Sequence, residues 1–259
     1  MTETLTHGAF LAGRHLKNLV RQPWFMIVQL VQPVVWLLLF GALFERVVDL
    51  PGFSGHGPYI EFIAPGVVVM MAMFSNSFSG LSTLGDIERG VIDRMLVSPI
   101  RRSSLVIGIV AHGAVVTVFQ SAVILVLALL AGARFSGGVA GLGLLVLSAV
   151  LVGTLLGSLS NGLALLLRRR ESVMAVNQFL LMPLTFLSSA FMDPKLAPRF
   201  IQRAAEVNPV NLAIEAGRAA LSPGGDASVV GVRLAVLALL AAVALWLATR
   251  AVAMYQRGV

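Results

Sequence analysis

Six long apolar segments constrain this chain more than any other feature of its sequence. About 20 apolar residues are enough for a helix to cross the hydrocarbon core of a bilayer. Only a helix or a closed barrel does so, because lipid offers the backbone no hydrogen-bond partners. We therefore predict an all-α membrane protein with six transmembrane helices. They lie near Trp24–Phe44, Phe62–Leu84, Leu105–Ala131, Val139–Leu167, Val173–Met192 and Val229–Ala251.

The composition agrees with this class of protein. Hydrophobic residues make up 58% of the chain, against roughly 45–50% in soluble domains. Six spans use about half of the residues, so we expect residues 1–259 to form a single transmembrane domain without a soluble catalytic domain. The net charge of +7 comes from basic residues that flank the spans and form no continuous basic face. Nucleic acid is therefore not an expected partner.

The basic residues also predict the orientation of the chain. They concentrate in the N-terminal segment, the 85–104 loop, the 168–172 loop and the C-terminus. The 45–61 and 132–138 loops hold only Arg46 and Arg134. Short loops rich in Lys and Arg stay in the cytoplasm. We expect both termini to be cytoplasmic, and we place the long 193–228 segment outside although it carries several cations.

The N-terminal segment, residues 1–23, has one apolar helical face, and Arg14, Lys17 and Arg21 lie off that face. A basic amphipathic helix of this kind lies in the headgroup plane of the membrane, with its cations toward anionic lipid. We predict such an interfacial helix here. The alternative is a plain juxtamembrane anchor with no mechanical role.

Prolines divide the segment 193–228. Pro198 can open one short helix that ends near Asn208, and Pro209 a second that ends before Ser222, because proline suits the first turn of a helix. Two short helices that meet at Asn208 can dip into the membrane and return, if protein covers the break. We predict an extracellular re-entrant segment.

The loop at residues 86–100 predicts a short helix. Ile87, Val91 and Met95 recur every four residues and form an apolar stripe, and Pro99 ends the helix. Glu88 is expected near its start, where the helix dipole favours a carboxylate. Such a helix can insert into a cleft on a soluble partner. The alternative is a solvated loop.

Several kinds of chemistry are missing from the sequence. No GxxxxGK[ST] phosphate-binding motif, HExxH motif or GxSxG motif occurs, so we expect no catalytic residues, no metal site and no cofactor in this chain. The only ionisable residue well inside a span is His112, whereas proton or ion relays usually need several. An energy source therefore belongs to another chain.

Three motifs together resemble a known family. The run from Glu88 to Arg102, the end of the fifth span at residues 187–191, and Asn208-Pro209 followed by Arg218 are similar to type-2 ABC exporter permeases. The chain departs at Asn211, where many relatives carry Thr. The resemblance implies an ATPase-coupling helix made of Ile87, Glu88, Arg89, Gly90, Val91, Asp93, Arg94, Met95 and Pro99. It also implies a re-entrant region that includes Pro198, Asn208, Pro209 and Arg218.

The resemblance further implies a half-permease that pairs with a second permease chain, the same or different, and with two ATPase subunits that bind ATP and Mg. It would export a drug, antibiotic, lipid or glycan-lipid from a bacterial cell through its inner membrane. Spans two and five would face the substrate path, although each residue there could simply pack helices together. The candidates are Met70, Met73, Phe74, Ser77, Asn177, Thr185 and Ser188. The competing function is a polytopic membrane enzyme or assembly factor without an ATPase.

Overall fold

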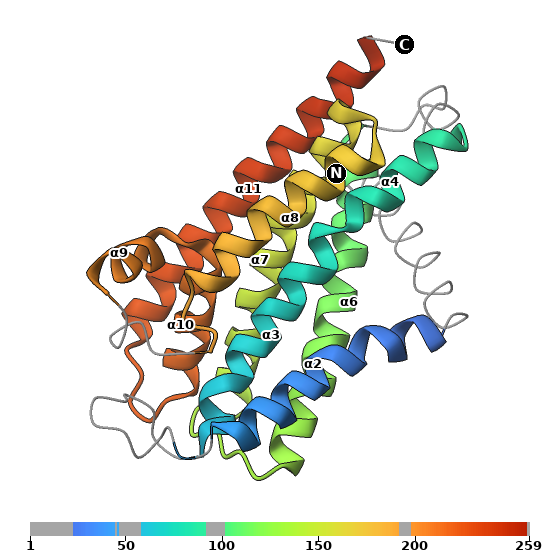
Figure 1. The fold of residues 1–259 in the computed structure, drawn as a ribbon. Coiled ribbons are helices and arrows are strands. Elements are labelled where there is room, and N and C mark those ends of the chain that lie inside the picture. The colour runs from blue at the N-terminus through green and yellow to red at the C-terminus, as the bar shows by residue number, and fades with distance from the viewer. Residues whose placement is uncertain (1–22, 45, 47–57, 92–101, 192–197, 258–259) are drawn as a thin grey trace.

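The computed structural model describes residues 23–44, 46, 58–91, 102–191 and 198–257, and these form a bundle of helices without strands (Figure 1). The long helices run roughly side by side, and two short helices, α9 and α10, lie at one end of the bundle. The helices are α2 (Pro23–Leu43), α3 (Tyr59–Ser77), α4 (Ser79–Glu88), α6 (Arg102–Leu130), α7 (Gly138–Leu167), α8 (Arg170–Phe186), α9 (Arg199–Val207), α10 (Pro209–Leu221) and α11 (Ala227–Arg257).

Four of the described stretches are long and apolar enough to cross a membrane: Tyr59–Glu88, Ile107–Leu130, Gly138–Leu167 and Ala227–Tyr255. They correspond to the second, third, fourth and sixth predicted spans. In α2, Leu30–Leu43 is a shorter apolar helix, and α8 has 17 residues. The first and fifth spans, and thus the total of six, stay predictions.

Helix α7 lies at the centre of the bundle, with α3, α6, α8, α10 and α11 packed around it. Leu145, Ala149 and Val152 on α7 are fully buried in the main apolar cluster. Small residues let neighbouring helices approach closely. A Cβ on Gly162 would lie 3.6 Å from the Cα of Ala248 on α11, so the two backbones are in near contact there.

The second span is interrupted, which the sequence did not predict. Helix α3 ends at Ser77 and α4 begins at Ser79, with Phe78 as a turn residue between them. Asn177 on α8 donates from its side chain to the Ser77 carbonyl (2.6 Å). Ser160 on α7 accepts from the Gly80 N–H (3.2 Å). Neighbouring helices therefore supply the hydrogen bonds that the interrupted helix lacks.

The fifth helix is shorter than the predicted span 173–192. Helix α8 ends at Phe186, and residues 187–191 form turns and bends. The Asn208 side chain donates to the carbonyls of Leu184 and Leu187, both at 2.8 Å. These carbonyls are thus hydrogen-bonded although the helix does not continue, so a contact distant in sequence supports its end.

The two short helices have the bounds that the prolines predicted. Helix α9 follows Pro198, and α10 starts at Pro209 and ends before Ser222. Helix α10 is buried among α3, α7 and α11, whereas Phe200 and Val207 on α9 are exposed. Insertion of this pair into a membrane stays a prediction.

The described loops and helix ends lie at two ends of the bundle. Arg170 contacts Glu88, and the Arg168 guanidinium lies over the Tyr255 ring at 4.5 Å, so the 168–172 loop, the end of α4 and the end of α11 share one end. At the other end, the Arg134 N–H donates to Glu61 (2.8 Å). Which end faces the cytoplasm stays a prediction.

Candidate functional site

The predicted coupling segment begins differently from the expectation. Asp86, Ile87 and Glu88 form the last turn of α4, so the position predicted for Glu88 at the start of a helix is wrong. The helix ends because Gly90 adopts a left-handed backbone with φ 64°, a conformation that glycine takes without steric cost. Val91 follows this turn. Asp93, Arg94, Met95 and Pro99 lie outside the described residues, as do Arg14, Lys17 and Arg21.

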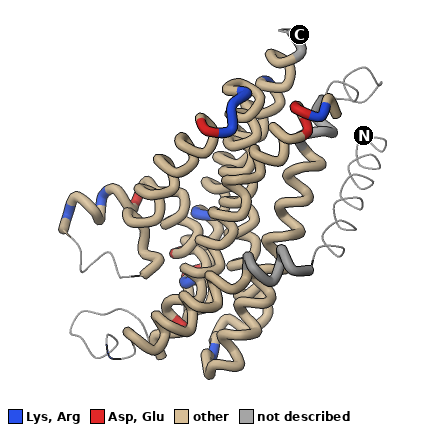
Figure 2. Tube along the Cα trace, turned by 45° about the vertical axis from the view of Figure 1, so that its right-hand side comes forward, with Lys and Arg blue, Asp and Glu red and all other residues tan. Residues whose placement is uncertain are grey.

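Glu88 forms a two-point ion pair with Arg170, the first residue of α8. Arg170 donates from Nε to Oε1 at 2.9 Å and from Nη2 to Oε2 at 2.8 Å. The hydrogen bond to Glu88 raises the pKa of Arg170 above its ordinary value. Both side chains are about half exposed. This ion pair joins the ends of α4 and α8 at one end of the bundle, where Figure 2 shows acidic and basic residues side by side.

Of the other predicted coupling residues, Ile87 packs against the bundle and Arg89 is exposed to solvent. Ile87 packs partly buried against Ala164 and Val173, so it contacts its own chain instead of projecting freely toward a partner. Arg89 is exposed and donates to Asp86 at 3.0 Å. Of the predicted apolar stripe, the structure therefore places Ile87 against α7 and α8, and Val91 beyond the Gly90 turn.

Asn208 and Pro209 join α9 to α10, as the sequence predicted. The Asn208 Oδ1 accepts from the Val210 N–H at 2.9 Å and so caps α10. Because its Nδ2 also bonds the end of α8, the Asn208 side chain joins α8 to α10, and its backbone N–H bonds the last turn of α9. Pro209 occupies the first position of α10, where the missing N–H costs nothing.

Arg218 on α10 fixes the segment between α8 and α9. Its guanidinium donates to the carbonyls of Phe62 (3.0 Å), Ser189 (2.7 Å) and Ala190 (3.5 Å). It also lies 3.6 Å from the centroid of the Phe62 ring, a cation–π geometry. Arg218 thus connects α10 with the start of α3 and with the non-helical residues after α8.

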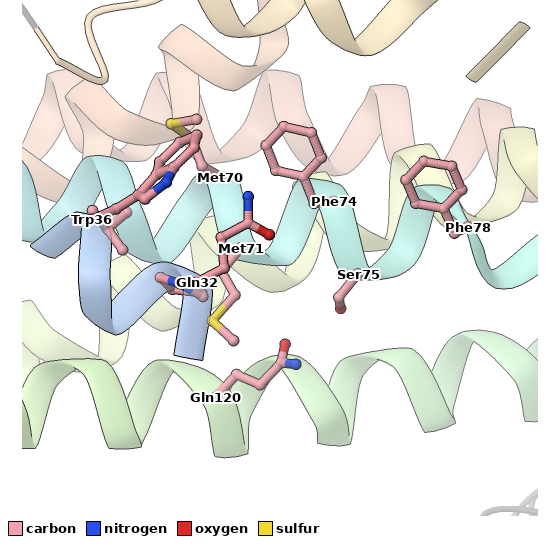
Figure 3. Close-up of a pocket in the computed structure, with 10 residues that line it drawn as sticks. Gln32, Trp36, Met70, Met71, Phe74, Ser75, Phe78 and Gln120 are labelled. Carbon is pink, nitrogen blue, oxygen red and sulfur yellow. The ribbon is translucent and has the colours of Figure 1, made fainter. Parts of the chain in front are cut away.

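A pocket of about 270 Å³ opens between α2, α3 and α6 (Figure 3). Its walls are mostly apolar and aromatic, with two glutamine side chains and one serine. In Figure 3, Gln120 projects from α6 toward α3, while the rings of Trp36 and Phe74 lie on the opposite side of the view. The lining residues are Gln32, Pro33, Trp36, Val67, Met70, Met71, Phe74, Ser75, Phe78 and Gln120.

The pocket takes in only part of the predicted substrate path. Met70 and Phe74 line it, whereas Met73 is fully buried in the core. Ser77 and Asn177 meet at the interruption of the second span.

Two further path candidates lie beyond that interruption, toward the end of α8. Thr185 donates to the Leu181 carbonyl at 2.7 Å. Ser188 donates to the carbonyl of Thr185 at the same distance. The structure therefore does not bring all of these residues to one surface.

Sequence reasoning missed Gln32, Trp36 and Gln120 as pocket residues. A signal was present, because Gln32 and Gln120 are carboxamides inside otherwise apolar spans, where polar residues are rare and tend to face the interior. What the sequence could not supply is their proximity to Met70 and Phe74, since these residues lie on three different helices.

Comparison with known proteins matches most of the sequence, up to the end of α10. The profile of the ABC-2 type transporter family matches residues 9–222. The daunorubicin resistance ABC transporter permease protein DrrB1 of Streptomyces coeruleorubidus is 28% identical over 84% of this chain and 74% of its own. The putative transport permease ycf38 of Cyanophora paradoxa is 30% identical over 79% and 70%. The inner membrane transport permease YadH of Escherichia coli K12 is 29% identical over 70% of each.

Proposed function

This chain belongs to the ABC-2 type transporter family, and from that premise we propose that it is one half of a permease that exports an amphipathic or lipophilic substrate across the bacterial inner membrane. It is a membrane subunit of an ABC transporter and a transport permease, not an enzyme. ABC-2 permeases work with an ABC ATPase. In our proposal two copies of that ATPase, with bound ATP and Mg, drive a dimer of permease chains whose termini are cytoplasmic.

The observation that carries this proposal is the ion pair between Glu88 and Arg170. It joins the start of α8 to the last turn of α4, where the 86–100 segment begins, the proposed docking site for the ATPase. A displacement of that segment would therefore move α4 and α8 together. Packed helices transmit such a displacement, because interiors are dense and resist compression.

The path continues from α4 and α8 into the bundle. At the interruption of the second span, Asn177 on α8 bonds the Ser77 carbonyl at 2.6 Å and the Ser160 hydroxyl at 3.1 Å. A shift of α8 would then change the angle between α3 and α4. Since α3 carries Met70 and Phe74 of the pocket, motion at the charged end of the bundle would reach the pocket wall.

A reconstituted complex tests the proposal. The purified chain alone should hydrolyse no ATP, because it has no phosphate-binding loop. With its ATPase in proteoliposomes, hydrolysis should drive substrate movement away from the side on which the ATPase sits. Hydrolysis by the isolated chain, or substrate movement toward the ATPase side, would contradict the proposed role.

The proposed orientation has its own test, since the chain lacks cysteine. Arg169→Cys should react with a membrane-impermeant maleimide only from the cytoplasmic side. Gly224→Cys, between α10 and α11, should react only from outside. The reverse pattern would overturn the orientation and leave the family assignment intact.

A further inference from the structure

We infer that the pocket between α2, α3 and α6 binds an uncharged amphipathic molecule that contains a ring system and at least one hydrogen-bonding group. This inference rests on the proposed function and narrows it, because it names the substrate class of the transporter. It is carried by the described residues that line the pocket, which are all uncharged, and by the contacts that hold the walls in place.

The apolar part of the lining suits rings. Trp36 and Phe74 offer faces and edges for aromatic stacking, which favours offset or edge-to-face contacts. Met70 and Met71 add flexible, polarisable side chains that adapt to differently shaped apolar groups. A ligand with a rigid ring system would contact these walls without losing much conformational freedom.

The polar part of the lining suits hydroxyl, carbonyl or amide groups. Gln32 and Gln120 each provide an amide that both donates and accepts hydrogen bonds, and Ser75 adds a hydroxyl. Among the described residues that line the pocket, none is Asp, Glu, Lys, Arg or His. A charged ligand group would lose its hydration without gaining a counter-charge, which is unfavourable.

The size of the pocket distinguishes it from ordinary packing. Its volume of about 270 Å³ is many times the roughly 10–15 Å³ that one water molecule needs. Gln120 lines this space although only 4% of its surface is exposed. The fold therefore keeps both an open space and a buried amide in the same place.

The aromatic wall is held in position by the segment after α8. The Trp36 ring lies 5.4 Å from the Phe191 ring and 6.1 Å from the Phe40 ring. The Tyr59 hydroxyl donates to the Phe191 carbonyl at 2.6 Å. Arg218 binds the two carbonyls just before it. Contacts of this kind preorganise the site, so fewer side chains lose conformational freedom when a ligand binds.

Tryptophan fluorescence tests the inference directly. The chain has three tryptophans, Trp24, Trp36 and Trp246. The double variant Trp24→Phe/Trp246→Phe therefore keeps only Trp36. In nanodiscs without the ATPase, this variant is titrated with the neutral probe N-phenyl-1-naphthylamine and with its sulfonated analogue 8-anilinonaphthalene-1-sulfonate. We expect saturable quenching of Trp36 by the neutral probe and binding about tenfold weaker or worse for the sulfonate. Equal affinity for both probes would overturn the uncharged class.

Two substitutions in this single-tryptophan background show where the probe binds. Ser75→Phe should fill the pocket and abolish saturable quenching, and Gln32→Leu, at the exposed rim, should weaken it several-fold. The matched control is Leu239→Phe on α11, at a side chain that is 65% exposed, and it should change nothing. If both pocket variants bind the probe like the control, the probe reaches Trp36 from the bilayer and the inferred site is wrong.

The same experiment separates this inference from the proposed function. Binding in nanodiscs needs no ATPase. A chain that binds the neutral probe in the pocket but supports no ATP-driven transport would refute the proposed function and keep the site. A chain that transports with wild-type rate when Ser75→Phe closes the pocket would refute the pocket as the substrate site and keep the proposed function.

Discussion

Two places in the described part of the chain where a helix is interrupted or ends, at Phe78 and after Phe186, are stabilised in different ways. At Phe78 the chain continues from α3 into α4 as one apolar stretch, and the neutral side chains of Asn177 and Ser160 bond the free backbone groups. After Phe186 the chain leaves the helix, and the cation Arg218 together with Asn208 bonds carbonyls that have no partner within the helix. The first interruption lies within one apolar stretch, whereas the second ends α8.

The difference follows from the energies of the contacts. Neutral side-chain hydrogen bonds between membrane helices contribute about 0.6 kcal/mol on average, while hydrogen bonds to charged groups contribute roughly 1.5–3 kcal/mol. A weakly held interruption can change its angle during transport, and a strongly held one keeps its shape. We expect the Phe78 interruption to be adjustable and the segment after α8 to be fixed.

The largest effect is expected at Arg218. Arg218→Ala should lower the free energy of unfolding by about 3 kcal/mol, because the carbonyls of Phe62, Ser189 and Ala190 lose a charged donor. Denaturation of the purified chain in detergent measures this. Arg199→Ala, at an exposed position on α9, is the matched control and should leave stability unchanged. If the two variants are equally stable, Arg218 does not fix the segment after α8, and the expected difference in rigidity between the two interruptions is wrong.

A smaller effect is expected at Asn208. Asn208→Ala should cost about 2 kcal/mol of unfolding free energy, since it removes the cap of α10 and two donors to α8. Asn208→Ser keeps an acceptor for the Val210 N–H and loses the two donors without adding a charge, so its loss should be smaller. The same detergent denaturation series measures both. A serine variant as unstable as alanine would mean that the cap contributes nothing.

The Phe78 interruption should tolerate substitution better. Asn177→Ala should cost only about 1 kcal/mol, because the bonds that it removes are neutral. Its effect on transport should exceed its effect on stability if this interruption changes angle. The ratio of the transport rate to the ATPase rate measures that coupling. A loss of stability as large as that of Arg218→Ala would show that both interruptions are equally rigid.

The smallest effect on stability is expected at the ion pair of Glu88 and Arg170, because both side chains are about half exposed. Glu88→Gln should leave the unfolding transition unchanged, because exposed ion pairs contribute little, yet it should uncouple ATP hydrolysis from transport. The charge swap Glu88→Arg with Arg170→Glu should restore coupling. If the swap remains uncoupled while each single variant binds the ATPase normally, the pair does not transmit the motion.

Some features were accessible from local sequence patterns. Pro198 and Pro209 predicted α9 and α10 because proline acts on the backbone next to it. The predicted helix start at Glu88 was wrong, because Gly90 at φ 64° stops α4 after that residue and starts a turn. The apolar stripe predicted a helix that continues through Val91. The left-handed conformation of Gly90, in the middle of the stripe, ends the helix before that residue.

The sequence by itself determined the class of the protein, since apolar segments of sufficient length need a membrane and a backbone that bonds internally. It also determined the short helices and the family motifs. Only the tertiary structure decided where the second span is interrupted, where α8 ends and which residues share a pocket. The partner of the Ser77 carbonyl, Asn177, lies 100 residues away, and the pocket joins Gln32, Met70 and Gln120 from three helices. A hydrogen bond depends on distance in space, and local sequence patterns carry no information about such distant partners.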